Sequence, residues 1–145
     1  MLREILALRQ DNPALRRRWF QDEFFDLYTW QSRDGRLARF QLCYDVRGRE
    51  RALTWSLEQG FSHNKVDAGD EYAGQPMTPL LVAAGKFPHR LVRARFRREA
   101  AALDASTRDF ILDKMREFGR HVARGEINLP RRPRARATPP SRNDA

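Results

Sequence analysis

FFDLYTWQSRDGRLARFQLCYDVRGRERALTWSL, residues 24–57, is the stretch of sequence from which the fold can be worked out. Apolar and polar residues alternate along most of it, which is the period of a half-buried β-strand. Asp34–Gly35 is a strong two-residue hairpin turn, and Arg47–Gly48 is a weaker one. The stretch therefore predicts three antiparallel strands joined by two tight turns.

The two turns also predict which residues face each other across the strands. Pairing Arg33 with Arg36 across the first turn brings together Phe25 and Tyr44, Leu27 and Leu42, Thr29 and Phe40, and Gln31 and Ala38. Pairing Val46 with Arg49 across the second turn adds Leu42 and Leu53, Phe40 and Trp55, and Ala38 and Leu57. Both registers put the apolar side chains of all three strands on one face. A one-residue slip would move them all to the other face.

Shorter elements are predicted on either side of this meander. The spacing of Leu2, Ile5, Leu6 and Leu8 predicts a short amphipathic helix over residues 2–9, and Asn12–Pro13 predicts a second helical turn through Arg16. The sequence FSHNKV predicts a fourth strand over 61–66, whose facing stays open because Glu58–Gly60 could carry a bulge. Residues 67–79 read as a polar loop, and Leu80–Val82 as a short strand or buried extended segment.

Two amphipathic helices follow. Pro88 marks a helix start, and Asp104 or Ser106 caps the next helix. Their apolar stripes recur at helical spacing: Val92, Phe96, Ala100 and Leu103, then Ile111, Met115, Phe118 and Val122. The predicted fold class is α+β: a three- to four-stranded antiparallel meander covered on one face by C-terminal helices, with a short N-terminal helix.

Length and composition bound the class of protein. The 145 residues suit one domain, which we expect over 1–125. Residues 126–145 hold four prolines and no aromatic side chain, so we expect a disordered basic tail. No apolar run is long enough to cross a membrane. The single cysteine, Cys43, forms no internal disulfide, and this favours a cytoplasmic location.

The formal charge is +9, from 28 Lys and Arg against 19 Asp and Glu. Removing residues 126–145 takes away five arginines and two acids, so the folded part keeps +6. Such a chain is attracted to polyanions such as nucleic acid or an acidic protein. The other interpretation is that an arginine bias merely coats a soluble surface.

One helix and the tail carry the densest positive charge. HRLVRARFRRE holds Arg90, Arg93, Arg95, Arg97 and Arg98, and three of these form one stripe along the predicted helix: Arg90, Arg93 and Arg97. The candidate phosphate-binding residues are Arg90, Arg93, Arg97 and Arg98 on this helix and Arg131, Arg132, Arg134 and Arg136 in the tail. Alternatively, the stripe is a solvated helix face whose arginines pair with Asp109, Asp113 or Glu117.

The outward face of the meander is a second candidate site. The predicted registers put Tyr28 beside Gln41 and Trp30 beside Arg39, so Tyr28, Trp30 and Arg39 form a stacking platform for a flat ligand or an unstacked base. Three other interpretations stay open. Arg39 and Trp30 could be an ordinary cross-strand pair, the N-terminal helix could cover this face, or the face could be a homodimer interface.

The same face carries an acidic corner. The registers place Asp26 and Asp45 on a diagonal and put Asp45 opposite Glu50, an arrangement that needs neutralising. We expect Arg47, Arg49 or Arg51 to do this rather than a metal ion, because no metal-ligand spacing is present. Cys43 lies next to Asp26, which would raise the pKa of its thiol and make it a poor nucleophile.

His63, Asp67, Asp70 and Glu71 are the remaining candidates for chemistry. A histidine near several carboxylates could supply a general base and its orienting group. However, the predicted strand places His63 beside Trp55, which favours a core histidine. Glycine-rich phosphate loops, GxSxG elbows and CxxC pairs are absent, so whether the chain is an enzyme stays open, and no cofactor is implied.

FQLCYDV (40–46), followed by ERALTW (50–55) and GFSHNKVD (60–67), resembles a group of small uncharacterised bacterial proteins. The resemblance covers residues 19–70 and implies a small stand-alone domain, but no activity and no functional residues. The hypothesis from the sequence is a non-enzymatic binding module for an anionic partner, nucleic acid first and an acidic protein second. The alternative is a small-molecule-binding or catalytic domain that uses the His63 region.

Overall fold

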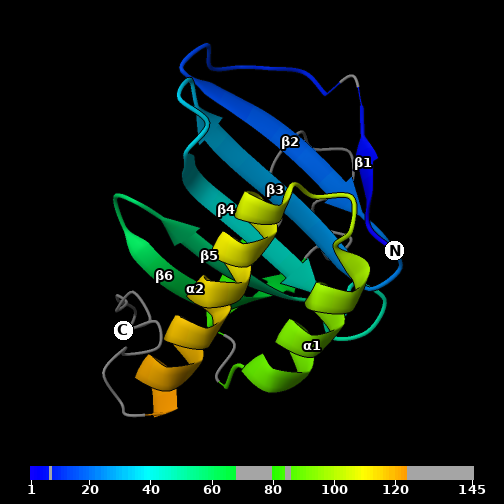
Figure 1. Ribbon diagram of the computed structural model, residues 1–145. Coiled ribbons are helices and arrows are strands. Elements are labelled where there is room, and N and C mark those ends of the chain that lie inside the picture. Colours follow the sequence, from blue (N-terminus) through cyan, green and yellow to red (C-terminus); the bar gives the residue numbers. More distant parts are fainter. Residues whose placement is uncertain (7, 68–79, 84–85, 124–145) are drawn as a thin grey trace.

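Seven strands follow one another across a single sheet in chain order, each antiparallel to its neighbours (Figure 1). The computed structural model describes residues 1–6, 8–67, 80–83 and 86–123. The strands are β1 (Arg3–Ile5), β2 (Leu15–Gln21), β3 (Phe25–Ser32), β4 (Leu37–Tyr44), β5 (Arg51–Ser56), β6 (Gly60–Asp67) and β7 (Leu80–Ala83).

Two helices, α1 (His89–Glu99) and α2 (Ala105–Ala123), lie on the same side of this sheet (Figure 1). An α+β fold with an antiparallel sheet and C-terminal helices is therefore confirmed. The predicted strand count of three to four is wrong, because the meander continues at both ends. The expected basic tail, residues 126–145, lies outside the described residues.

The N-terminal segment is a strand, so the predicted helix over residues 2–9 is wrong. β1 pairs with β2, with Glu4 opposite Phe20. The Leu2 side chain is fully buried, and its N–H donates to the carbonyl oxygen of Glu99 at the end of α1 (2.9 Å). An isolated helix this short is barely stable, whereas pairing with β2 satisfies the backbone groups of the segment. Leu6, which would lie on the apolar face of the predicted helix, is 74% exposed.

Asn12–Pro13 forms a turn into β2, so the predicted helical turn through Arg16 is also wrong. The Ala14 N–H donates to Asn12 Oδ1 (2.8 Å), and the Leu15 N–H donates to the Asn12 carbonyl (3.2 Å). An asparagine side chain that bonds to the backbone two residues on stabilises a turn by itself. The chain then enters β2, where Phe20 points to the helices and Trp19 to the opposite face.

The predicted registers of the central strands are confirmed. Strands β3 and β4 pair Thr29 with Phe40, and β4 and β5 pair Phe40 with Trp55. One pair differs: Gln31 faces Leu37 instead of Ala38, because the register shifts after Trp30.

The shift comes from the length of the first loop. Ser32 and Arg36 are joined by a hydrogen bond from the Ser32 N–H to the Arg36 carbonyl (2.9 Å), which leaves three loop residues instead of two. Gly35 closes the loop with φ +88°, a left-handed conformation that glycine adopts without strain. A turn of this kind, with glycine last, introduces a bulge beside it.

Strand β6 is confirmed, and its facing is now defined. His63 points into the core opposite Leu53, not beside Trp55 as predicted, and it is fully buried. The reason is that the turn between β5 and β6 consists of Leu57, Glu58 and Gln59, whereas the sequence predicted a turn over residues 58–60. Leu57 consequently leaves the apolar face to which the sequence assigned it and is 77% exposed.

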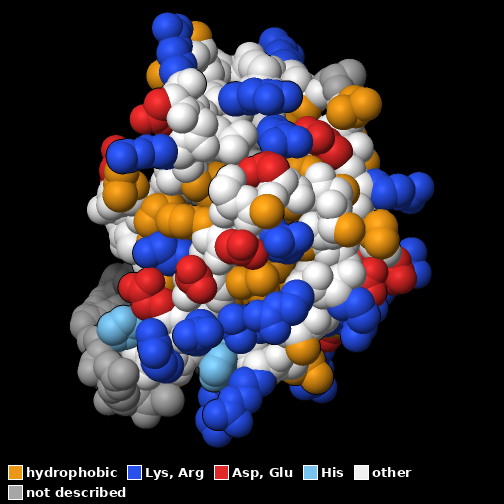
Figure 2. Space-filling model, in the orientation of Figure 1, with side chains coloured by type: hydrophobic (Ala, Val, Ile, Leu, Met, Phe, Trp, Pro, Cys, Tyr) orange, Lys and Arg blue, Asp and Glu red, His pale blue; other side chains and the backbone are white. Residues whose placement is uncertain are grey.

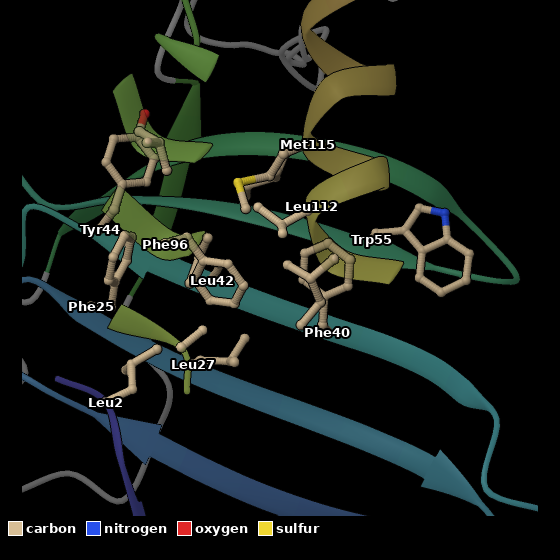
Figure 3. Packing of buried hydrophobic residues seen from close by; sticks show 14 of the residues in the cluster. Leu2, Phe25, Leu27, Phe40, Leu42, Tyr44, Trp55, Phe96, Leu112 and Met115 are labelled. Carbon is tan, nitrogen blue, oxygen red and sulfur yellow. The ribbon is translucent and has the colours of Figure 1, made fainter. Parts of the chain in front are cut away.

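The core lies between the sheet and the helices. In Figure 3 the inward side chains of β3, β4 and β5 point toward α1 and α2. Aromatic contacts tie the layers together: Phe25 meets Phe96 edge-on (5.6 Å between ring centroids), and Trp55 meets Phe110 in the same way (5.1 Å).

Both predicted helical stripes are confirmed as the buried faces of the helices. The buried stripe residues are Val92 and Phe96 on α1 and Ile111, Met115 and Phe118 on α2, with Val122 partly buried. Ala100 and Leu103 are also in the core but lie in the link between the helices, because α1 ends at Glu99. Of the two predicted caps, Asp104 is the N-cap of α2, because its Oδ2 accepts a hydrogen bond from the Thr107 N–H (3.2 Å). Within the described residues, no helix combines the length and apolar character needed to cross a membrane.

We predict that Leu2→Ala destabilises the protein by about 2–5 kcal/mol, because truncation leaves a cavity between β1 and the end of α1. Urea unfolding followed by far-UV circular dichroism measures the change. The matched control, Leu6→Ala, removes an exposed side chain and should stay within about 0.5 kcal/mol of the parent. Equal effects of the two substitutions would contradict the assignment of residues 3–5 to the sheet.

Candidate functional site

An aromatic row crosses the sheet face opposite the helices. It consists of Trp19 on β2 and Tyr28 and Trp30 on β3. Trp19 lies directly opposite Tyr28, and the two rings are stacked with centroids 5.5 Å apart and planes 10° apart. Tyr28 and Trp30 follow at 6.1 Å. All three side chains are half-buried, so each keeps part of its ring in contact with solvent.

Arg39 extends this aromatic row onto β4. Its guanidinium lies 4.6 Å from the centre of the Trp30 ring, which is the cross-strand pair that the register predicted. The predicted platform of Tyr28, Trp30 and Arg39 thus occupies one continuous surface. No described helix covers this surface, because β1 replaces the predicted N-terminal helix (Figure 1).

Trp19 was not predicted as a site residue. Residues 17–21 had no assigned element, because three consecutive arginines hide the alternation of LRRRWFQ. A usable signal was Asp22, whose Oδ1 accepts from the N–H groups of Phe24 (2.8 Å) and Phe25 (2.7 Å) in the turn between β2 and β3. An aspartate that closes a turn before an alternating strand is a hairpin signal.

The Trp30 end of the aromatic row is basic. Arg17 on β2 lies opposite Trp30 on one side, and Arg39 on β4 lies opposite it on the other. Arg33 and Arg36 lie in the turn that joins β3 to β4. Arg36 and Arg17 each have a carboxylate near 4 Å, Asp34 at 3.9 Å and Asp11 at 3.8 Å. Arg33 and Arg39 have no carboxylate within 4 Å among the described residues.

A hollow of about 580 Å³ opens beside Trp30. The residues that line it include Trp30, Arg39, the acidic Glu58 and the hydroxyl-bearing Thr54, Ser56 and Ser62. Thr54 Oγ1 is buried and has no hydrogen-bond partner among the described residues. An aromatic residue, one arginine, one glutamate and several hydroxyl-bearing residues give this hollow a mixed apolar and polar lining, as in small-ligand pockets.

The opposite end of the aromatic row is acidic. The indole N–H of Trp19 donates to Asp26, which lies opposite Cys43. Burial raises the pKa of Asp26, and burial followed by the charge of Asp26 raises the pKa of Glu50. The partly buried carboxyl groups of Asp26 and Glu50 therefore lie close enough to interact.

The acidic corner departs from its prediction in two ways. Asp45 leaves the strand with φ 57°, and its carboxylate accepts from the Arg49 N–H (3.2 Å) instead of facing Glu50. Arg47, Arg49 and Arg51 form no ion pair with these carboxylates in the described part of the chain. Among the described residues no group of three or more His, Cys, Asp and Glu side chains could hold a metal ion.

Cys43 is 5% exposed, and burial raises the pKa of its thiol to about 12. Burial is the larger cause, and the neighbouring carboxylates add to it as the sequence suggested. At neutral pH the thiolate is scarcely populated, so Cys43 is a poor nucleophile.

Of the candidate residues His63, Asp67, Asp70 and Glu71, the structure describes only the side chain of His63, which lies in the core. His63 Nε2 is hydrogen-bonded to the Tyr44 hydroxyl (2.7 Å) within a cluster that also contains Phe87 and Phe118. Complete burial separates the imidazole from any dissolved substrate. The side chains of Asp67, Asp70 and Glu71 lie outside the described residues.

The arginine stripe on α1 lies on the side of the molecule away from the aromatic row. Arg98 pairs with Glu99 (3.1 Å), and Arg93 Nε donates to the Leu112 carbonyl (3.0 Å). The predicted pairs with Asp109, Asp113 or Glu117 do not form among the described residues. Arg131, Arg132, Arg134 and Arg136 lie outside the described residues.

Comparison with protein-family models, curated proteins and solved structures gives no match to this chain. The resemblance to small bacterial proteins over residues 19–70 stays an expectation.

We predict that Glu50→Gln raises the melting temperature at pH 7 and that this gain shrinks as the pH falls. The folded pKa of Glu50 lies above its unfolded value, so folding costs free energy when the carboxyl is ionised. That cost is fully present above the folded pKa and is absent below the unfolded pKa. Thermal unfolding of both proteins between pH 7 and pH 4 measures the difference. A gain that does not change with pH would contradict this account.

Proposed function

We propose that the protein binds single-stranded nucleic acid on the outer face of its sheet. The observation that carries the proposal is the aromatic row Trp19–Tyr28–Trp30, which is only partly buried and is continuous with Arg39. Successive bases stack on rows of this kind, and because every base has a π-face, such binding tolerates different sequences. The proposed function is binding, without a catalytic step.

The charges near the aromatic row support this ligand. Arg17, Arg33, Arg36 and Arg39 surround the Trp30 end, where a bound strand would place its phosphates. The hollow beside Trp30 could take the edge of one base, whose polar groups would meet Thr54, Ser56 and Ser62. The net charge of +9 would increase the rate of encounter with any polyanion.

Single strands fit this face better than duplexes do. Stacking on Trp30 requires a base that is free of its own neighbours, and in a duplex the bases are already stacked and paired. This face also carries no described helix that could enter the groove of a duplex. We therefore expect a preference for single strands with little sequence specificity.

We predict that Trp30→Leu weakens binding of a mixed-sequence single-stranded oligonucleotide about 5- to 150-fold, the loss of one base–aromatic stack. Trp30→Phe keeps an aromatic ring and should retain most of the affinity. Fluorescence anisotropy with a labelled oligonucleotide at fixed salt gives both dissociation constants, after circular dichroism has shown that the variants fold.

The contribution of Arg33 and Arg39 can be measured in the same assay through the salt dependence of binding. Replacing Arg33 and Arg39 with glutamine should lower the slope of log K against log salt by about 1.4, since each phosphate contact to a single strand contributes about 0.7. Arg97→Gln, on the helix face, should leave the slope unchanged. If Arg97→Gln weakens binding and Trp30→Leu does not, the nucleic acid lies on the helices and the proposal is wrong.

The homodimer interpretation makes a different prediction for the same face. A second copy on the aromatic row would bury Trp30 and give a mass that rises with concentration in sedimentation equilibrium. Disruption of that association by Trp30→Leu, without any oligonucleotide binding, would replace the proposed function with a self-association surface.

A further inference from the structure

A second basic hollow lies on the opposite side of the molecule, where the two helices face solvent. Figure 2 shows Lys and Arg side chains gathered in a band across this side, over α1 and α2. The hollow, called here the arginine hollow, is lined by Arg93, Arg97, Arg108, Asp109, Leu112, Asp113 and Arg116. Arg116 and Arg108 come from α2 and were not among the predicted site residues.

Few carboxylates neutralise these cations. Asp109 forms an ion pair with Arg108 of the same helix (3.2 Å). Glu117, the residue after Arg116, forms an ion pair with Lys114 (3.2 Å). Arg93, Arg97 and Arg116 have no carboxylate within 4 Å among the described residues. Four arginines against two aspartates leave the lining with a charge of +2.

The packing of the helices holds these charges together. Arg93 donates from Nε to the carbonyl of Leu112 in the neighbouring helix (3.0 Å), which fixes one edge of its guanidinium and leaves the terminal N–H groups for another acceptor. Burial, followed by the charges of Arg97 and Arg116, lowers the pKa of Arg93. The repulsion is offset by the buried contact of Val92 and Phe96 with the sheet and α2, since these side chains belong to the core.

We propose that the arginine hollow is a binding site for a phosphate dianion, either free phosphate or the phosphomonoester of a small ligand. Guanidinium groups bind phosphate oxygens through paired N–H donors, and Arg93, Arg97 and Arg116 offer three such groups around one hollow. The surplus of +2 matches the charge of about −1.5 to −2 on a phosphomonoester at neutral pH.

The site is preorganised for this ligand. The repulsion among the arginines is already present in the free protein, so a bound dianion relieves it and needs no rearrangement of the helices. Because the arginine hollow and the aromatic row lie on opposite sides of the sheet, this inference is independent of nucleic-acid binding. Either can fail without the other.

The test is calorimetric titration of the full chain with inorganic phosphate and with glycerol phosphate, at constant ionic strength maintained with sodium chloride. We expect saturable binding with one site per chain. Arg97→Gln and Arg116→Gln should each raise the dissociation constant about tenfold, because each removes a charge-assisted contact. Tighter binding of glycerol phosphate would identify a monoester as the ligand, and tighter binding of inorganic phosphate the free ion.

Arg98→Gln is the matched control. It removes the same charge from the same helix, but Arg98 is paired with Glu99 and does not line the arginine hollow. Its dissociation constant should equal that of the parent. Absence of saturable binding to either compound would overturn the proposal. So would an equal loss of affinity in Arg98→Gln and Arg97→Gln, because the attraction would then be a property of net charge alone.

Discussion

The register of β3, β4 and β5 is the constraint on which the rest of the structure depends. Because side chains alternate along a strand, pairing Phe40 with both Thr29 and Trp55 determines which face each side chain occupies, except beyond the register shift after Trp30. The inward set packs against α1 and α2 and forms the core. The outward set contains Tyr28, Trp30 and Arg39. The same pairing that stabilises the fold thus also builds the candidate binding surface.

Placing both helices on one side of the sheet separates the two basic surfaces of the molecule. From the sequence alone, the arginines of α1 and the aromatic side chains of the meander belonged to one hypothesis about anion binding. The structure places these groups on opposite sides, so a single short ligand cannot contact Trp30 and Arg97 together. Each surface has its own arginines: Arg33 and Arg39 near the aromatic row, and Arg93, Arg97 and Arg116 between the helices. This division is why we propose two separate ligands, with nucleic acid on the sheet and a phosphate dianion on the helices.

The sequence predicted the parts of the fold that depend on local pattern and turn chemistry. The central registers, the fourth strand, both helices and the Asp104 cap all follow from residues close together in the chain. The errors have two causes: partners distant in sequence decide some placements, and the length or type of a local turn decides others. Residues 2–9 form a strand because β2 provides an edge, and β2 itself was hidden by its arginines. His63 moved from Trp55 to Leu53 because the turn starts at Leu57. Arg116 and Trp19 were missed as site residues because helix packing and strand pairing bring them into place.

The most direct test of the central claim uses the three tryptophans of the chain as internal probes. Trp19 and Trp30 lie on the outer face, whereas Trp55 is in the core and 7% exposed. Proton–nitrogen correlation spectra resolve the three indole N–H signals, and a single-stranded oligonucleotide can be titrated into the labelled protein. The account predicts that the Trp30 signal shifts most, that Trp19 follows, and that Trp55 stays in place. A titration that leaves the Trp19 and Trp30 signals unchanged while backbone signals of α1 and α2 move would contradict it.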